Sequence, residues 1–241
     1  MSDVITKEFY KIEREKPTIG ALLMVKNEEK RISVSLDSLV GKVDALIIYD
    51  TGSTDKTIEI IETFCEKNKL NLYLKKGNFV NFSVSRNISL DFADTTNVHY
   101  IILLDCNDEL QGTILRDICL HFMDKDNNAF LFCQQWWCGQ MDKYYNVRLV
   151  KARCGWRYMG SVHEWMKDTL SPTENSRFPV IRLPDSIVLY QDRTKDDDKS
   201  RKRFTRDREL LLTDYKNVVT LIFPHTLVMI QHLDFHVKIQ Y

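Results

Sequence analysis

The sequence predicts an α/β fold with a mainly parallel central sheet flanked by helices, followed by a smaller antiparallel β part. Between residues 19 and 125, four apolar segments alternate with four helix-like segments. This alternation favours parallel strands joined by right-handed crossovers. After residue 126 the alternation stops, and aromatic-rich, β-like segments follow with no long helix between them. Hydrophobic residues make up 44% of the 241 residues, enough for a large core.

The first two predicted strands, IGALLMV (19–25) and VDALIIYD (43–50), are continuous apolar runs, as expected of strands buried on both faces. The third and fourth strands are predicted at 70–76 and 100–105. Helices are predicted at 28–40, 81–93 and 114–125, and residues 51–68 are predicted to be a turn leading into a helix. Asn27 is the expected cap of the first helix, and Ser53 or Thr54 that of the second.

The two ends of the chain are expected to lie outside the main domain, which spans 18–195 with halves at 18–125 and 126–195. Residues 1–17 are predicted to be a polar lead-in containing a partly ordered helix, and 196–241 a C-terminal helical segment with a helix at 200–215. Basic and acidic residues alternate in that helix, which favours a solvated face over binding of phosphate, membrane or nucleic acid.

Composition narrows the class of protein. The formal net charge is zero, whereas nucleic-acid-binding proteins usually carry a basic excess, so no nucleic-acid partner is expected. The N-terminus lacks the apolar segment of a signal peptide, and the apolar run at 218–230 is too short to span a bilayer. Six scattered cysteines suit reduced thiols. A cytoplasmic protein is therefore expected, the host cytoplasm if it is viral.

Polar clusters follow three of the predicted strands. They are Lys26-Asn27-Glu28, the run from Asp50 to Asp55, and the run from Asp105 to Glu109. In open parallel sheets, ligands bind beyond the carboxyl ends of the strands. We therefore expect the three clusters to converge on one edge and to form the functional site.

Five segments resemble, in order, the motifs of family 2 glycosyltransferases with the GT-A fold. They are MVKNEE, DTGSTDKT, SVSRNISLDFA, LLDCNDEL and the acceptor-side GWRYMGSVHEWM, and the resemblance covers roughly residues 18–195. The first half would then bind the nucleotide-sugar and the second half the acceptor. The resemblance implies a nucleotide-sugar donor, a divalent metal ion, and transfer of one sugar to an acceptor.

The resemblance aligns Asp105 and Asn107 with the family's Asp-x-Asp and implies a Mn²⁺ or Mg²⁺ ion held by Asp105, Asn107 and His163. Hard oxygen ligands and such an ion would neutralise a departing diphosphate. Asn107 is a departure, because an amide oxygen brings no charge. Asp108 could substitute for it, or metal binding could have been lost. A second departure is LYQDR near residue 190, where the family often has a histidine.

The resemblance also implies the residues that contact the donor. Asp50 would accept a hydrogen bond from the base, with the alternative that it forms an Asx-turn before the next helix. Arg86 could clamp a carboxylate or phosphate, with a surface helical arginine as the alternative. The predicted donor-binding set is Lys26, Glu28, Asp50, Ser53, Arg86 and Asn87.

An inverting transferase needs a base that takes the proton of the acceptor hydroxyl. Glu164 is the first candidate and Asp108 the second. The aromatic faces of Trp136, Trp137 or Trp156 could stack on a sugar, although core packing is the more usual role of tryptophan.

The sequence is therefore interpreted as a metal-dependent glycosyltransferase using UDP-glucose or UDP-N-acetylglucosamine. A soluble protein or glycan is the expected acceptor, and inversion the expected outcome. The alternatives are a nucleotide-sugar hydrolase and a non-catalytic module that binds nucleotide-sugars. The sequence does not set the oligomeric state.

Overall fold

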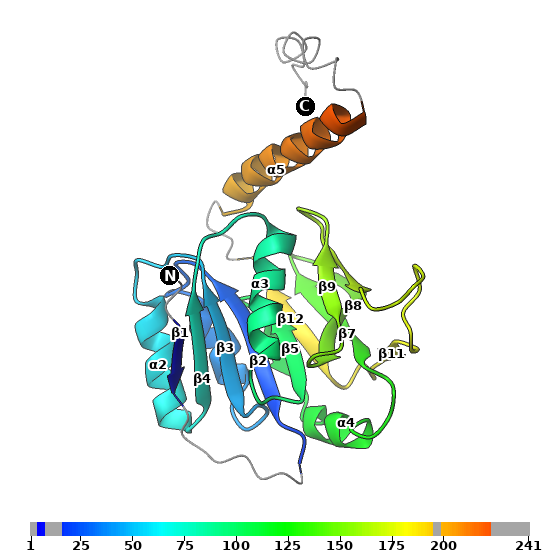
Figure 1. Ribbon diagram of the computed structural model, residues 1–241. Coiled ribbons are helices and arrows are strands. Elements are labelled where there is room, and N and C mark those ends of the chain that lie inside the picture. The colour runs from blue at the N-terminus through cyan, green and yellow to red at the C-terminus, as the bar shows by residue number, and fades with distance from the viewer. Residues whose placement is uncertain (1–3, 8–15, 195–198, 223–241) are drawn as a thin grey trace. The chain divides into compact units, whose positions relative to one another are not determined.

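The computed structural model describes residues 4–7, 16–194 and 199–222. The chain divides into two compact units, Met1–Gly160 with Glu164–Lys195, and Ser161–His163 with Asp196–Tyr241. Figure 1 shows the elements of both. No helix in the described ranges is long and apolar enough to cross a membrane.

The larger unit is built on four parallel strands in the order β4-β3-β2-β5 (Figure 1). The strands are β2 (Ile19–Val25), β3 (Ala45–Asp50), β4 (Asn71–Lys76) and β5 (Tyr100–Leu104). Their connections carry α1 (Ile32–Ser38), α2 (Thr57–Asn68) and α3 (Phe82–Asp94). The predicted α/β class and the first three strand–helix pairs are thus confirmed, and the fourth strand, β5, is followed by its helix after the short strand β6 (Glu109–Gln111).

The sheet continues beyond β5 with strands of mixed direction. Next to β5, in the order β8-β7-β12-β6, lie β8 (Met141–Lys151), β7 (Ala129–Trp137), β12 (Val188–Asp192) and β6 (Glu109–Gln111). The pairs β5–β8, β8–β7 and β12–β6 are antiparallel, and β12 runs parallel to β7. The remaining elements of this part are α4 (Leu115–His121), β11 (Ile181–Arg182) beside β7, and a separate hairpin of β9 (Trp156–Met159) and β10 (Trp165–Asp168).

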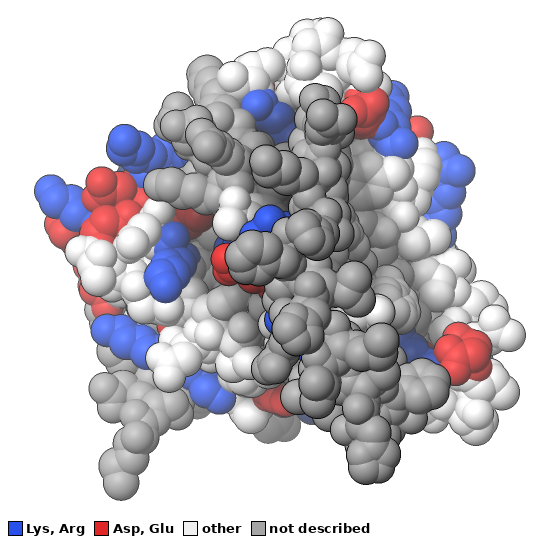
Figure 2. All heavy atoms as spheres, turned by 90° about the horizontal axis from the view of Figure 1, so that it is seen from above, with Lys and Arg blue, Asp and Glu red and all other residues white. Residues whose placement is uncertain are grey.

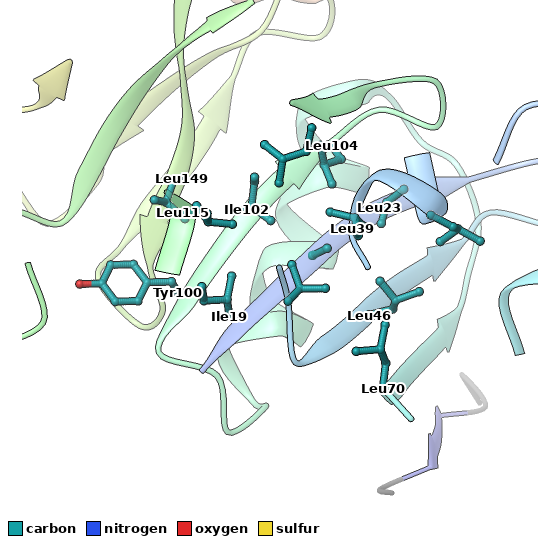
Figure 3. Packing of buried hydrophobic residues seen from close by; sticks show 14 of the residues in the cluster. Ile19, Leu23, Leu39, Leu46, Leu70, Tyr100, Ile102, Leu104, Leu115 and Leu149 are labelled. Atoms are coloured by element: carbon teal, nitrogen blue, oxygen red, sulfur yellow. The ribbon is translucent and has the colours of Figure 1, made fainter. Parts of the chain in front are cut away.

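The core fills both faces of the parallel strands, because successive side chains of a strand point to opposite faces. Ile19, Leu23 and Leu46 are fully buried on one face and pack in the cluster shown in Figure 3. Leu22 and Ile47 belong to the cluster on the other face, with residues of α3 and β9. Each such side chain contributes about 1.5–3 kcal/mol on burial. Continuous apolar runs therefore formed strands covered on both sides.

Several element boundaries differ from those predicted. Residues 4–7 form a strand, β1 (Val4–Lys7), paired antiparallel with β4 at the sheet edge, rather than part of a helix. The helices predicted at 28–40 and 114–125 are shorter, at 32–38 and 115–121. The last helix, α5 (Lys199–Ile222), is longer than the predicted 200–215, and the rest of the C-terminal segment lies outside the described residues.

Candidate functional site

The three polar clusters meet at one edge of the sheet, as predicted. Val25 pairs with Asp50, and Leu23 pairs with Leu104 across neighbouring parallel strands. The residues that follow these strands, Lys26, Thr51 and Asp105, therefore start from the same edge. Figure 2 shows the molecule from above, with basic and acidic side chains interspersed, in agreement with the zero net charge.

The loops after β2 and β3 are joined by a series of hydrogen bonds. Asn27 Oδ1 accepts from the backbone N–H of Thr54 at 2.7 Å, and Ser53 Oγ accepts from the N–H of Asn27 at 3.0 Å. The N–H groups of Glu28 and Glu29 donate to side-chain oxygens that follow β3, those of Thr57 and Asp55. The predicted helix-capping roles of Asn27, Ser53 and Thr54 are thus wrong, because these residues join the two loops instead. Arg31 and Lys56 are the N-cap residues, and neither makes a side-chain capping bond.

Asp50 forms the Asx-turn that was the alternative to its donor role. Its Oδ1 accepts from the backbone N–H groups of Ser53 at 2.8 Å and Gly52 at 3.2 Å. The residue is only 3% exposed, and Gly52 supplies the positive φ of the turn, 102°. Asp50 therefore fixes the shape of its loop. Its contact with a nucleotide base, and those of Lys26, Glu28 and Ser53 with a donor, stay predictions.

Two arginines hold the carboxylate of Asp105, directly after β5. Arg86 Nη2 donates to Oδ1 at 2.6 Å from α3, and Arg148 Nη2 donates to Oδ2 at 3.3 Å from β8. The side chains of Arg86 and Arg148 are 15% and 11% exposed, and that of Asp105 is 36% exposed. The cluster is therefore largely buried, with Asp105 as the member most open to solvent.

Arg86 also connects this cluster to Glu164. Its Nε lies 2.7 Å from Glu164 Oε1, and the Glu164 side chain is 13% exposed. Nε makes no hydrogen bond within the described ranges, so its contact with Glu164 is an ion pair. The guanidinium carbon lies 5.2 Å from the ring centre of Tyr158. The candidate base is thus placed beside Asp105 through one shared arginine.

Asn87, beside Arg86 on α3, is engaged by the backbone of β9. Its Nδ2 donates to the carbonyl of Tyr158 at 2.9 Å, and its Oδ1 accepts from the N–H of Tyr158 at 2.7 Å. Both ends of the amide are therefore used to attach the β9–β10 hairpin to α3. Asn87 positions the segment that leads to Glu164, and a contact with the donor stays a prediction.

The pKa values of Asp105 and Asp108 are shifted in opposite directions. Burial by itself would raise the pKa of Asp105, but the neighbouring charges of Arg86 and Arg148 outweigh it and hold the pKa below its usual range. Burial, together with the charge of Asp105, raises the pKa of Asp108 to about 7. Asp108 is 1% exposed, and its Oδ2 accepts from the backbone N–H of Asp105 at 2.8 Å. Asp108 therefore has its carboxylate turned into the loop and stabilises the turn.

The side chain of Gln191 closes the same turn from β12. Its Nε2 donates to Asn107 Oδ1 at 2.7 Å and to Asp108 Oδ1 at 3.2 Å. Its Oε1 accepts from Arg193 Nε at 2.6 Å, and the Arg193 guanidinium lies over the ring of Trp136 at 3.2 Å. Asn107 and the segment LYQDR are the two departures from the family pattern. They are in direct contact through the hydrogen bond between Asn107 and Gln191.

The side chains of this turn, as they are arranged, do not fit the predicted metal ion. All five side-chain oxygens of Asp105, Asn107 and Asp108 accept N–H donors. Across the described ranges, no three His, Cys, Asp or Glu side chains are grouped so that they could share a metal. His163 is exposed and belongs to the smaller unit. The Mn²⁺ or Mg²⁺ ion therefore stays a prediction, as does its ligation by His163.

The tryptophans divide by location. Trp156 is 5% exposed, and its Nε1 donates to Asn128 Oδ1 at 3.0 Å, so it is a core residue and cannot stack on a sugar. Trp136 is covered on one face by Arg193 and lies against Tyr144. Trp137 is 38% exposed.

Sequence reasoning missed Arg148 and Gln191. Arg148 lies in YYNVRLVKA, predicted only as a β-like segment, and Gln191 lies in LYQDR, noted only because this segment lacks the histidine that the family often has near residue 190. A charged residue inside an apolar strand was the available signal for Arg148, because such a residue is rarely buried unless it is paired.

The fold is an α/β fold that places acidic and basic groups at the carboxyl edge of a parallel sheet. The sequence profile of Glycosyl transferase family 2 matches residues 21–179, which is about two thirds of the chain. The chain belongs to this family.

Two curated relatives match a shorter stretch. The SPbeta prophage-derived glycosyltransferase SunS of Bacillus subtilis (strain 168) is 32% identical over 85 residues, which are 35% of this chain and 19% of that protein. Glycosyltransferase SunS of Bacillus phage SPbeta gives the same values. The match thus spans about a fifth of the length of these relatives.

Solved structures show a more distant likeness. S. aureus TarS, residues 1–349, is 22% identical, with a TM-score of 0.44 over 51% of this chain and 37% of that chain. The same TarS fragment in complex with UDP-GlcNAc also has a TM-score of 0.44 and 22% identity, over 51% of this chain and 36% of that chain. The 4-diphosphocytidyl-2C-methyl-D-erythritol synthase of Anaerococcus prevotii is 16% identical, with a TM-score of 0.40 over 57% of this chain and 71% of that chain.

Proposed function

We propose that the chain binds a nucleotide-sugar at the carboxyl edge of β2, β3 and β5 and transfers its sugar to an acceptor hydroxyl. The observation that carries this proposal is the convergence of Arg86, Arg148 and Glu164 around Asp105, in a chain that belongs to glycosyl transferase family 2. Arginines at such an edge suit a diphosphate, which they bind through paired N–H donors.

The donor that we propose is UDP-glucose or UDP-N-acetylglucosamine, and the acceptor a soluble protein or glycan. Asp105 carries a charge at neutral pH, because its pKa is held below the usual range by the arginines after burial has been overcome. Arg86 and Arg148 are protonated at neutral pH, and the N–H donors that Asp105 does not use are available to phosphate oxygens.

Glu164 is the proposed base. The acceptor oxygen attacks the anomeric carbon as the bond to the diphosphate breaks, and a carboxylate oxygen of Glu164 takes the hydroxyl proton. This single displacement inverts the anomeric centre. Asp108, the second candidate, is almost fully buried, and its oxygens accept from Asp105 and Gln191. This geometry favours Glu164.

The test is turnover of UDP-glucose and UDP-N-acetylglucosamine, with protein and glycan acceptors added in turn. We expect UDP release that rises with an acceptor, and a product of inverted configuration by NMR. Glu164→Gln should lower kcat by about 10²–10⁴-fold with nucleotide affinity retained. Acceptor-independent release of free sugar would indicate a hydrolase instead, and binding without turnover on any acceptor would indicate a binding module.

A further inference from the structure

The side-chain oxygens of the turn after β5 lie among N–H donors, two of which belong to positively charged arginines. Each side-chain oxygen of Asp105, Asn107 and Asp108 accepts a hydrogen bond, and the donors are two guanidinium groups, the Gln191 amide and one backbone N–H. A divalent ion such as Mg²⁺ needs oxygen lone pairs directed at it. Here two guanidinium groups pair with Asp105, so a divalent ion bound to this carboxylate would lie beside two positive charges that oppose its binding.

The contact of Asn107 with Gln191 extends this observation. The hydrogen bond joins two neutral amides that lie 84 positions apart in the chain, at 2.7 Å. Neither side chain carries a charge, and the Gln191 nitrogen is a donor that has no lone pair for a metal. Gln191 is held in this orientation because Arg193 donates to its oxygen. The amides of Asn107 and Gln191 are therefore joined by a hydrogen bond and offer no charged ligand to a metal ion.

The positive charge at the carboxyl edge of the sheet comes from the side chains of Arg86, Arg148 and Lys26. Arg86 and Arg148 are both largely buried, and each has five N–H donors, of which Asp105 takes one apiece. Arg148 Nη1 is buried and makes no hydrogen bond within the described ranges. Burial opposes the charge of Arg148, but Asp105 outweighs it and raises the pKa of Arg148 above its usual range. Lys26 follows β2 at the same edge and is exposed.

We infer that this chain binds the diphosphate of its donor through Arg86 and Arg148 and does not require a divalent metal ion. The inference rests on the proposed function and departs only from the metal dependence that the sequence predicts. The phosphate oxygens take up N–H donors of the two guanidinium groups, including those that Asp105 leaves unused. Asp105, the most exposed member of the cluster, keeps the two arginines side by side until the nucleotide arrives.

The first experiment uses the full chain and needs no variant. Isothermal titration with UDP, GDP, CDP and dTDP is run in EDTA and again in Mn²⁺. We expect at least one nucleotide to bind with dissociation constants that agree within about threefold between the two buffers. Without nucleotide, the electron paramagnetic resonance signal of free Mn²⁺ should not decrease when the protein is added. Binding of nucleotide only in Mn²⁺, or tight binding of Mn²⁺ alone, would overturn the inference.

Two variants test the residues. Arg148→Gln should weaken nucleotide binding about tenfold or more in both buffers, and Arg148→Lys, which keeps a charge, should lose less. Arg116→Gln is the matched control, because Arg116 pairs with Asp44 just before β3 begins, at the opposite end of that strand from Asp50, and its loss should leave binding unchanged. Equal binding by wild type and Arg148→Gln, with both folded by circular dichroism, would contradict the role of Arg148.

The double variant Asn107→Asp with Gln191→His removes both amides of the pair. It replaces two neutral amides by a carboxylate and an imidazole, both of which bind metal. We expect the variant to bind Mn²⁺ and to hold nucleotide about tenfold more tightly in Mn²⁺ than in EDTA, unlike the wild type. If no nucleotide binds the wild type in either buffer, the proposed function fails together with the inference. If binding requires Mn²⁺, only the inference fails.

Discussion

Asn87 on α3 pairs with the backbone of Tyr158 on β9 through both ends of its amide, at 2.9 and 2.7 Å. This double hydrogen bond attaches the β9–β10 hairpin to the helix that carries Arg86. Glu164, which immediately precedes β10, is thereby kept near Arg86. Asn87 thus helps to fix the position of the candidate base relative to the arginine cluster.

Replacing Asn87 by Ala should destabilise the fold and lower activity. Two backbone groups of Tyr158 would lose their partners, and we expect a loss of about 2 kcal/mol in the free energy of unfolding, measured with urea. Asn127→Ala is the control, because Asn127 makes one exposed hydrogen bond to the carbonyl of Pro179. Equal losses in the two variants would contradict the positioning role.

Asn27 adopts a left-handed backbone conformation, with φ of 54°, while its side chain holds the loop after β3. Asn27→Ala and Asn27→Gly both remove the bond to Thr54. Only alanine resists the left-handed conformation, at a cost of about 1–2 kcal/mol. We therefore expect Asn27→Gly to be more stable than Asn27→Ala by about 1 kcal/mol in thermal unfolding. The reverse order would indicate that the loop changes conformation in the variants.

Asp108 should make stability fall as pH rises from about 4 to about 7. Its pKa is raised from 3.8 to about 7 by burial and by Asp105, so over this range the folded chain holds a proton that the unfolded chain has released. Each unit of pKa difference corresponds to about 1.4 kcal/mol. Asp105 has the opposite effect, because its pKa is lowered and its contribution is lost as pH falls below about 4.

Asp108→Asn should flatten this decline in the free energy of unfolding, measured by urea titrations between pH 4 and pH 8. The exposed Asp117→Asn is the control and should keep the wild-type slope. An unchanged slope in Asp108→Asn would show that Asp108 is ionised throughout this range.

Gly112 and Gly139 separate two effects of a missing side chain. Both have positive φ, at 95° and 97°. A Cβ at Gly112 would lie 2.3 Å from the carbonyl oxygen of Ser186, whereas one at Gly139 would meet nothing within 4 Å. Both alanine variants carry the backbone strain, of about 1–2 kcal/mol. Gly112→Ala should lose about 1 kcal/mol more in the free energy of unfolding, because of overpacking. The clash cannot be relieved by moving β6, which ends at Gln111, because β6 must stay paired with β12. Equal melting temperatures would contradict the clash.

The four core strands and the edge at which the polar clusters meet could be predicted from the sequence. Runs such as IGALLMV favour a strand buried on both faces, and parallel strands bring their carboxyl ends to one edge. Strand β1 was missed because it is four residues long and pairs at a sheet edge, where no apolar pattern is required. The ends of the helices were missed because they depend on tertiary contacts more than on propensity.

The sequence by itself determined the α/β class, the four strand–helix units and the family, because apolar periodicity and the order of motifs are properties of the chain. Only the tertiary structure decided how the polar residues are used. Arg148 reaches Asp105 across 43 positions, and Gln191 reaches Asn107 across 84. Hydrogen bonds of this kind depend on which strands become neighbours, so a carboxylate that could have held a cation was instead found between two arginines.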